Sequence, residues 1–245
     1  MINENQKTIG KQEFLFENIN HFKNYPSLRP WIGKSYSSNR ILVVGESHYL
    51  EPGCSCHLDS ERWYSGESST DLTTENIKWM NTQRIITNGI KNRWKERSKL
   101  IYKNLESALK QTGLFHEIEP YSPFEYIAYL NFFQRPAQTD GDSIKPDRND
   151  ITYSRLILNE ILLTINPRLV IFCTRLGAKE ANLKNIKLEN PHIQLHVTAH
   201  PASAWWNRPS KKSGGVTSRQ SFIEFLKGNT NNKSESLLDD CRPTP

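Results

Sequence analysis

The sequence predicts one α/β domain with a three-layer αβα arrangement around a central, mainly parallel four-stranded sheet. Short apolar runs recur along the chain, and stretches with helical spacing of apolar residues separate them. The 245 residues are enough for one sizeable core. We therefore expect a single domain over residues 1–227. The Asn-, Ser- and Asp-rich segment 228–245 is expected to be a disordered tail.

The expected elements follow from hydrophobic periodicity and from breaker residues. Apolar runs predict strands over residues 40–44, 126–133, 169–173 and 195–199. Helical spacing predicts helices in part of 1–25, over 75–89, 93–112 and 151–165, from near Ala178, and over 219–226. The polar stretch 50–76 is expected to be a long loop, and such loops are often functional.

The composition of the chain limits the cellular compartments and the classes of partner that we expect. No apolar run approaches the roughly 20 residues that a membrane-spanning helix needs. The first residues are polar and lack the apolar stretch of a signal peptide. We expect a cytoplasmic monomer without membrane contact. The net charge of +6 fits a nucleic-acid partner, although solubility alone can also account for it.

One short segment has the residue types of a metal site. Cys54, Cys56 and His57 lie together, but a single residue separates the cysteines instead of the usual two. No second ligand pair is visible in the sequence. This pattern favours a reduced thiol pair in a loop, with a metal site as the alternative.

Two polar loops stand out because each directly follows a predicted strand. The first is Gly-Glu-Ser-His-Tyr at residues 45–49, and the second is His-Pro-Ala-Ser-Ala-Trp-Trp at residues 200–206. Ligands of open α/β sheets bind outside the carboxyl ends of the strands. We expect the two loops to meet across one sheet and to form an active-site cleft.

Four segments resemble motifs of the uracil-DNA glycosylase superfamily and occur in the same order. They are the loop 45–49, Asn131, the segment 167–181 and the His-Pro-Ala-Ser loop 200–203. The loop 45–49 takes the place of the water-activating motif. Asn131 resembles the strand asparagine that hydrogen-bonds the base, and segment 167–181 looks like the penultimate strand and the helix after it. Residues 214–225 are similar to the closing helix, so the resemblance covers roughly residues 38–227.

The resemblance implies hydrolysis of the N-glycosidic bond of uracil, or of a related damaged base, in DNA during base excision repair. His200 would stabilise the departing base by hydrogen bonding, and Asn131 would read the base edge. Glu46 or His48 would position or deprotonate the attacking water. Tyr49 would close the pocket against larger bases.

Further contacts follow from the same resemblance. Gly45, Ser47 and Tyr64 are expected to contact the substrate, and DNA contacts are expected from Ser203, Trp205, Arg208, Lys211 and Arg219. No metal or organic cofactor is expected, because hydrogen bonds alone stabilise this leaving group.

The first motif departs from the family pattern at its centre. The most active members carry Gly-Gln-Asp-Pro-Tyr-His, in which the aspartate orients the water, whereas Ser47 and His48 stand here in place of Asp-Pro. A weak glycosylase, a different nucleobase substrate and lost activity all remain open. Two other classes compete: a serine hydrolase that uses Ser47 and His200, without the second glycine of a nucleophile elbow, and a catalytically silent nucleic-acid-binding module.

Overall fold

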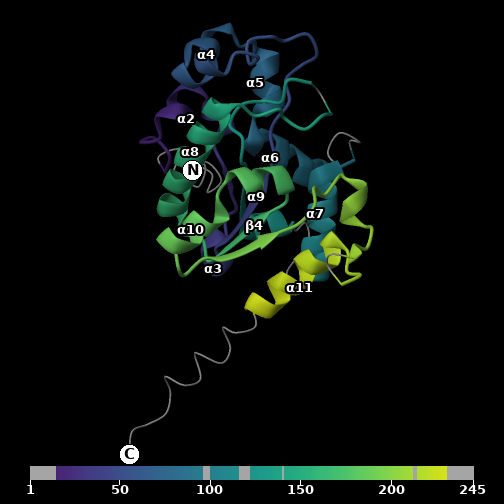
Figure 1. The fold of residues 1–245 in the computed structure, drawn as a ribbon. Coiled ribbons are helices and arrows are strands. Elements are labelled where there is room, and N and C mark those ends of the chain that lie inside the picture. Colours follow the sequence, from purple (N-terminus) through teal and green to yellow (C-terminus); the bar gives the residue numbers. More distant parts are fainter. Residues whose placement is uncertain (1–14, 96–99, 116–121, 140, 212–213, 231–245) are drawn as a thin grey trace, which may run out of the picture.

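The computed structural model describes residues 15–95, 100–115, 122–139, 141–211 and 214–230, which form an α/β structure around one sheet (Figure 1). The sheet has five strands in the order β1-β3-β2-β4-β5. Their bounds are Trp31–Ile32 for β1, Ile41–Gly45 for β2, Ile127–Asn131 for β3, Leu169–Phe172 for β4 and Gln194–Val197 for β5. Strands β2 to β5 pair in parallel, and β1 pairs antiparallel with β3.

The prediction of four strands is therefore wrong by one. Strand β1 has only two residues, so it carries no alternating pattern that a sequence could reveal. It is placed by its partners: Trp31 lies opposite Tyr129 in the ladder, and the Trp31 indole donates a hydrogen bond to the Phe124 carbonyl at 2.7 Å. The prolines near this strand predict only an interruption of the helical pattern that precedes it.

The helices surround the sheet, with some boundaries that differ from the predicted ones. They are α2 (Asn20–Asn24), α3 (Tyr36–Asn39), α4 (Ser60–Ser65), α5 (Thr74–Met80), α6 (Thr82–Asn92), α7 (Leu100–Gln111), α8 (Arg148–Ile165), α9 (Arg175–Glu180), α10 (Leu183–Glu189) and α11 (Ser218–Thr230). The 3₁₀ turns are η1 (Pro26–Leu28), η2 (Glu67–Asp71), η4 (Pro123–Tyr126) and η5 (Ala204–Trp206).

Capping residues explain two early helix starts. Helix α8 begins three residues before its predicted start, because Asp147 and Asp150 form a reciprocal capping box. Helix α9 begins at Arg175 because the Thr174 hydroxyl accepts a hydrogen bond from the Gly177 N–H.

Two stretches without predicted structure are partly helical. The expected loop 50–76 contains α4, whose N-terminus is capped by the Asp59 carboxylate through the Glu61 and Arg62 N–H groups. Helix α11 continues to Thr230, so the expected tail does not begin at residue 228. Residues 231–245 lie outside the described part of the chain.

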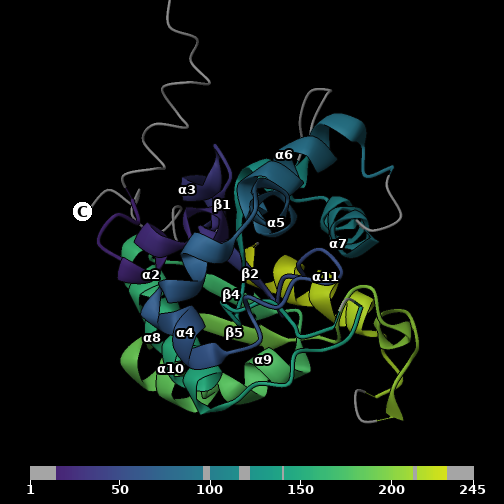
Figure 2. The same ribbon diagram turned by 90° about the horizontal axis from the view of Figure 1, so that it is seen from above.

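Strand side chains alternate between two hydrophobic clusters, one on each face of the sheet. On β2, Leu42 and Val44 join the cluster that includes residues of α8, α9 and α10, whereas Ile41 and Val43 join the cluster with α6, α7 and α11. Figure 2 shows these two groups of helices on opposite sides of the strands. Within the described residues, no helix has both the length and the apolar character needed to cross a bilayer.

The parallel register brings the strand ends to one edge of the sheet. Gly45 lies opposite Asn131, and Val44 lies opposite Phe172. The hydrogen-bond ladder continues past the strands, because the Phe133 N–H donates to the Glu46 carbonyl at 2.9 Å and the Cys173 N–H donates to the Val44 carbonyl at 2.8 Å. The loop after β2 is thus held between the segments that follow β3 and β4.

Candidate functional site

A cavity of about 640 Å³ lies at this edge of the sheet. Its walls include Glu46, Ser47, His48 and Tyr49 from the loop after β2, Asn131 from the end of β3, His200 and Ser203 from the loop after β5, and Trp79, Tyr102 and Tyr129. Its volume falls within the range of small-molecule pockets, about 300–1,000 Å³. The two loops singled out in the sequence therefore line one cavity.

Glu46 is held at the cavity by the segment after β4. Its Oε2 accepts a hydrogen bond of 2.7 Å from the Thr174 hydroxyl, which itself accepts from the Gly177 N–H at 3.0 Å. The single hydroxyl therefore fixes the carboxylate of the first loop and caps α9 at the same time. A carboxylate held in this way can accept a proton or orient a water molecule.

His200 offers a neutral imidazole to the cavity. Burial lowers its pKa from the ordinary value of 6.5, and the nearby Glu46 carboxylate partly opposes that shift. A neutral ring has one donor and one acceptor nitrogen at pH 7. The loop is anchored on both sides, since Asn104 donates to the Pro201 carbonyl at 2.8 Å and the Ala199 N–H donates to the Ser218 hydroxyl at 3.2 Å.

Asn131 is oriented by its own strand. Tyr129, two residues earlier on the same face, donates from its hydroxyl to Asn131 Oδ1 at 3.0 Å. Burial raises the pKa of Tyr129 well above 10, so this hydroxyl stays protonated and keeps donating. Because Oδ1 is engaged, the side-chain NH₂ of Asn131 is the group available to donate to a ligand.

Position 45 must be a glycine, because it lies against the side chains of Tyr129 and Asn131. A Cβ atom at position 45 would lie 2.2 Å from Asn131 Oδ1 and 2.2 Å from the Tyr129 hydroxyl oxygen. Both distances are far inside van der Waals contact. Only a residue without a side chain lets the first loop pass this close to the asparagine.

His48 and Tyr49 tie the first loop to its surroundings. The buried His48 ring has its Nε2 3.1 Å from the Thr82 hydroxyl, at the start of α6, and the His48 carbonyl accepts from the Ala137 N–H at 2.8 Å. The Tyr49 hydroxyl donates to the Asp142 carbonyl at 3.1 Å. Both side chains thus line the cavity while they hold its wall.

Tyr64, which is expected to contact the substrate, lies elsewhere. Its hydroxyl donates to Asp150 at 3.1 Å, and its ring stacks on Tyr153 at 4.6 Å between centroids. It is not among the residues that line the cavity. The reason is that the expected loop folds into α4, which buries Trp63 and Tyr64 in the hydrophobic cluster over α8.

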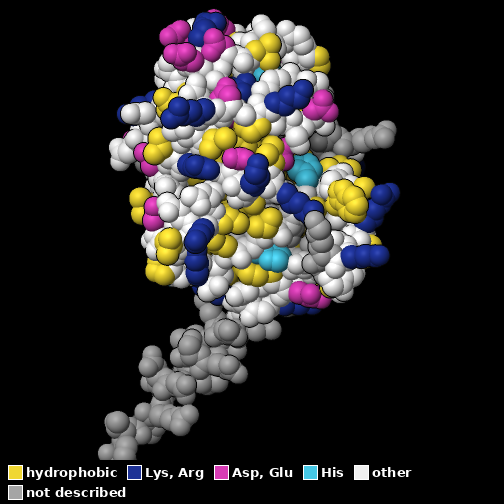
Figure 3. All heavy atoms as spheres, viewed as in Figure 1, with side chains coloured by type: hydrophobic (Ala, Val, Ile, Leu, Met, Phe, Trp, Pro, Cys, Tyr) yellow, Lys and Arg dark blue, Asp and Glu magenta, His cyan; other side chains and the backbone are white. Residues whose placement is uncertain are grey.

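The residues expected to contact DNA lie along and after the second loop. Trp205 is 57% exposed, and Arg208 and Lys211 are also exposed. Arg219 is half-buried and donates to the Ser107 hydroxyl on α7 at 3.0 Å. In the view of Figure 3, Lys and Arg side chains are spread over the face, whereas acidic side chains gather over α4.

Sequence reasoning missed two supporting residues. Tyr129 shares the face of Asn131 because side chains two apart on a strand point the same way. Thr174 follows β4 after one intervening residue, close to the position that singled out the two loops. The period of the strand and the position after its end could have identified both.

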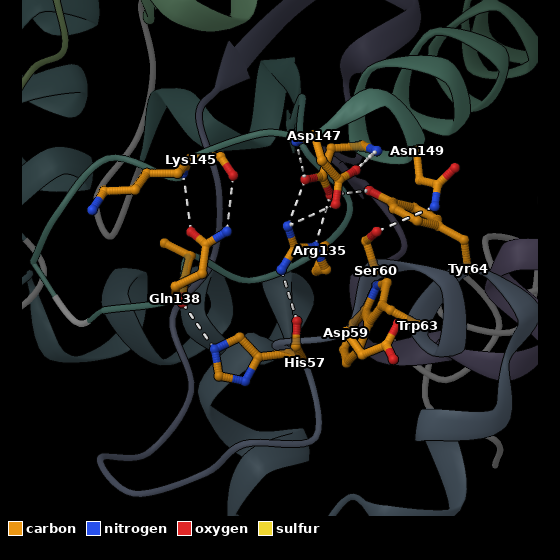
Figure 4. Close-up of polar contacts among 12 residues, drawn as sticks. His57, Asp59, Ser60, Trp63, Tyr64, Arg135, Gln138, Lys145, Asp147 and Asn149 are labelled. Carbon is orange, nitrogen blue, oxygen red and sulfur yellow. Dashed lines mark hydrogen bonds and ion pairs between the residues drawn. The ribbon is translucent and has the colours of Figure 1, made fainter.

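A buried ion pair supports the segment that follows Asn131 (Figure 4). Arg135 Nε lies 2.8 Å from Asp150 Oδ1, and Arg135 Nη2 lies 2.6 Å from Asp150 Oδ2. Arg135 also donates to the His57 carbonyl at 2.8 Å. The bidentate pair fixes the chain after β3 to the first turn of α8, where the sequence had indicated only a polar loop.

The chain was also compared with known proteins. Neither the protein-family models nor the curated proteins include a match to it.

Proposed function

We propose that this chain takes a uracil-like base of DNA into the cavity and hydrolyses its N-glycosidic bond. The observation that carries the proposal is the convergence of Glu46, Asn131 and His200 on one cavity at the carboxyl ends of the strands. The proposal includes a three-layer αβα fold of the uracil-DNA glycosylase type. It rests on the resemblance of the four sequence segments and on the helices that cover both faces of the parallel sheet.

Stabilisation of the departing base falls to two donors. When the glycosidic bond breaks, negative charge develops on the base and is carried by its carbonyl oxygens. A neutral His200 donates one hydrogen bond to such an oxygen, and the Asn131 NH₂ donates another to the base edge. Both groups are positioned before the substrate binds, so little reorganisation is needed during the reaction.

Activation of the water is assigned to Glu46 in preference to His48. The Glu46 carboxylate lines the cavity and accepts from Thr174, which leaves its remaining lone pairs for a water molecule. The His48 Nε2 is already engaged with the Thr82 hydroxyl. In this assignment Glu46 replaces the aspartate that the family motif carries at the position of Ser47.

Binding requires that the base leave the stack and pack against apolar or aromatic groups. The cavity offers the rings of Tyr49, Trp79 and Tyr102. The exposed Trp205 and the cations Arg208 and Lys211 lie along the second loop, where DNA flanking the base would pass. These features support DNA over a free nucleoside as the substrate.

The deciding experiment incubates the purified chain with a uracil-containing oligonucleotide and measures alkali-labile abasic sites. We expect His200→Ala and Asn131→Ala to lower the rate by about 100-fold or more, the usual effect of losing one such donor. His192→Ala is the matched control, because His192 is exposed and pairs with Asn166 outside the cavity. Absence of abasic product with uracil and with common damaged bases refutes the proposal.

The serine hydrolase alternative has weaker geometric support. Ser47 and His200 line the same cavity, but among the described residues no hydrogen bond joins them. A hydrolase would be labelled at Ser47 by a fluorophosphonate probe, whereas a glycosylase or a silent binding module would not. Salt-dependent DNA binding without abasic product would identify the binding module.

A further inference from the structure

Three potential metal ligands lie together away from the candidate site. The Sγ atoms of Cys54 and Cys56 are 3.0 Å apart, and one donor atom from each of Cys54, Cys56 and His57 lies within 4.8 Å of the other two. Cys54 and His57 also line a second cavity of about 280 Å³. The fold thus gathers two sulfur donors and one nitrogen donor beside an open space.

The hydrogen bonds of His57 determine which nitrogen is free. Its Nε2 lies 3.0 Å from the Ala137 carbonyl oxygen, and a carbonyl can only accept, so Nε2 carries the proton. Nδ1 therefore has the lone pair, and this buried atom has no hydrogen-bond partner among the described residues. His57 is only 3% exposed, so water does not readily compensate for the missing partner.

The surroundings of His57 are those of a positioned metal ligand. Histidines that bind metals usually donate their second ring N–H to a backbone carbonyl or a carboxylate, which fixes the ring and its tautomer. Ala137 supplies that carbonyl. Figure 4 shows the imidazole reaching this contact while the His57 backbone carbonyl accepts from Arg135. Side chain and backbone are therefore both fixed before any ion binds.

The separation of the two sulfurs is close to that on a tetrahedral ion. Zinc lies about 2.3 Å from a thiolate sulfur and about 2.0 Å from an imidazole nitrogen, so two sulfurs on one tetrahedral ion are roughly 3.8 Å apart. The observed separation of 3.0 Å requires a shift of less than about 1 Å. Both cysteines are free and half-buried, and they lie in a short loop.

We propose that Cys54, Cys56 and His57 bind one Zn²⁺ ion. Both thiols lose their protons to solvent and bind as thiolates, His57 binds through Nδ1, and a water molecule from the second cavity fills the fourth position. The single-residue spacing of the cysteines had favoured an unliganded thiol pair. The structure adds that His57 lies beside the cysteines and that the lone pair of its Nδ1 atom has no hydrogen-bond partner among the described residues.

Such an ion would stiffen one wall of the candidate site. His57 contacts the Ala137 carbonyl, and the Ala137 N–H donates to the His48 carbonyl at 2.8 Å. The ion would therefore link the loop before α4 to the segment that holds His48. The proposed zinc site does not depend on the reaction proposed for the cavity, so either can fail alone.

The test uses the full chain, purified with a thiol-free reductant, loaded with ZnCl₂ and freed of excess metal. We expect about one zinc per chain by atomic emission, since the three residues form one site. Cys54→Ser, Cys56→Ser and His57→Ala should each weaken zinc binding at least tenfold in a chelator competition. Cys173→Ala is the matched control, because Cys173 is a buried thiol directly after β4 and is not one of the three proposed ligands.

A second measurement covers variants that fail to fold. Zinc should slow alkylation of Cys54 and Cys56 by iodoacetamide in the unmodified chain, as followed by peptide mass spectrometry. Cobalt(II) in place of zinc should give the intense absorption of thiolate-to-metal charge transfer. The proposal is overturned if no zinc is retained, if the three variants bind zinc as the parent does, or if Cys54 and Cys56 form a disulfide under these conditions and bind no metal.

Discussion

At the scale of single residues, Gly45 is under the tightest steric restriction in the candidate site. A Gly45→Ala variant would place a methyl group 2.2 Å from both Asn131 Oδ1 and the Tyr129 hydroxyl. We expect a loss of stability of about 1–3 kcal/mol, as for other overpacked sites. The displaced Asn131 should also lower any glycosylase activity. Urea unfolding measures the first effect and the abasic-site assay measures the second.

Gly228→Ala is the matched control for this variant. Position 228 lies in α11, and a Cβ atom there has no neighbour within 4 Å. Alanine is favoured over glycine inside a helix by about 0.5–1 kcal/mol, so this variant should be as stable as the parent or more stable. Equal stability of Gly45→Ala and the parent would contradict the steric account.

The protonation of His200 gives a second prediction at this scale. Burial lowers its pKa below 6.5 and Glu46 opposes that shift, so removing the carboxylate should lower the pKa further. We expect the His200 ring signals in an NMR titration to have a midpoint below pH 6.5 in the parent. In Glu46→Gln the midpoint should be lower still. A midpoint at or above 6.5 would show that the ring is not desolvated as described.

At the scale of elements, the Arg135–Asp150 pair joins the segment after β3 to α8. Both side chains are almost completely buried, at 1% and 0% exposure. Asp150→Asn removes the nearer counter-charge of a buried guanidinium, which keeps only the Asp147 carboxylate at 3.9 Å. Breaking a buried pair typically costs about 3–5 kcal/mol. Urea unfolding should show a loss of this order.

An exposed pair provides the comparison. Arg62 and Asp71 lie 3.1 Å apart, but their side chains are 49% and 44% exposed. Asp71→Asn should cost less than about 1 kcal/mol, because solvent screens surface pairs. Similar losses for Asp150→Asn and Asp71→Asn would mean that burial does not govern the Arg135 pair.

Helices and strands with a strong hydrophobic periodicity could be predicted from the sequence, whereas short ones could not. Strands β2, β3 and β4 are fully buried runs, whereas β5 is a partly exposed edge strand, and each predicted range overlaps the observed one. Strand β1 and helix α4 were missed because their structure depends on tertiary partners. β1 exists through its ladder with β3, and α4 through the burial of Trp63 over α8.

The same contrast holds for the candidate site. The rule that polar residues after parallel strands share one edge was enough to place Glu46, Asn131 and His200 around one cavity. Tyr64 lies outside this cavity, because α4 faces the core and no pattern in the sequence shows that it does. The role of Thr174 was hidden as well, since its contact with Glu46 joins residues 128 positions apart.

At the scale of the whole molecule, one buried histidine should make stability depend on pH. Burial lowers the pKa of His21 from 6.5 to about 4. Between these values the unfolded chain binds more protons than the folded chain, so stability falls as the pH drops from 6.5 towards 4. The full loss attributable to His21 is on the order of 3 kcal/mol.

Unfolding measured at pH 7 and pH 4.5 tests this prediction. His21→Phe should retain the aromatic packing of the site and show a smaller loss between the two pH values than the parent. His192→Ala, which removes an exposed imidazole, should lose as much as the parent. Identical pH dependence in the parent and His21→Phe would exclude His21 as a source.

The net charge of +6 leads to a further prediction for the whole molecule. If the proposed DNA partner is correct, affinity should fall steeply as salt rises, because binding releases counterions. Arg208→Ala and Lys211→Ala should each reduce the slope of log affinity against log salt by about 1. Fluorescence anisotropy with a labelled oligonucleotide measures the slope. Affinity that does not change with salt would remove the electrostatic basis for DNA binding.

The order of the strands has a consequence for protein synthesis. Strand β2 leaves the ribosome before its sheet partner β3, which follows about 80 residues later, whereas β5 and His200 come after the other four described strands and join the sheet at its edge. A nascent chain can therefore pair β2, β3 and β4 while the cavity still lacks its histidine loop. If the proposed reaction is correct, partly synthesised chains would be folded around the central strands and inactive until the final strand docks.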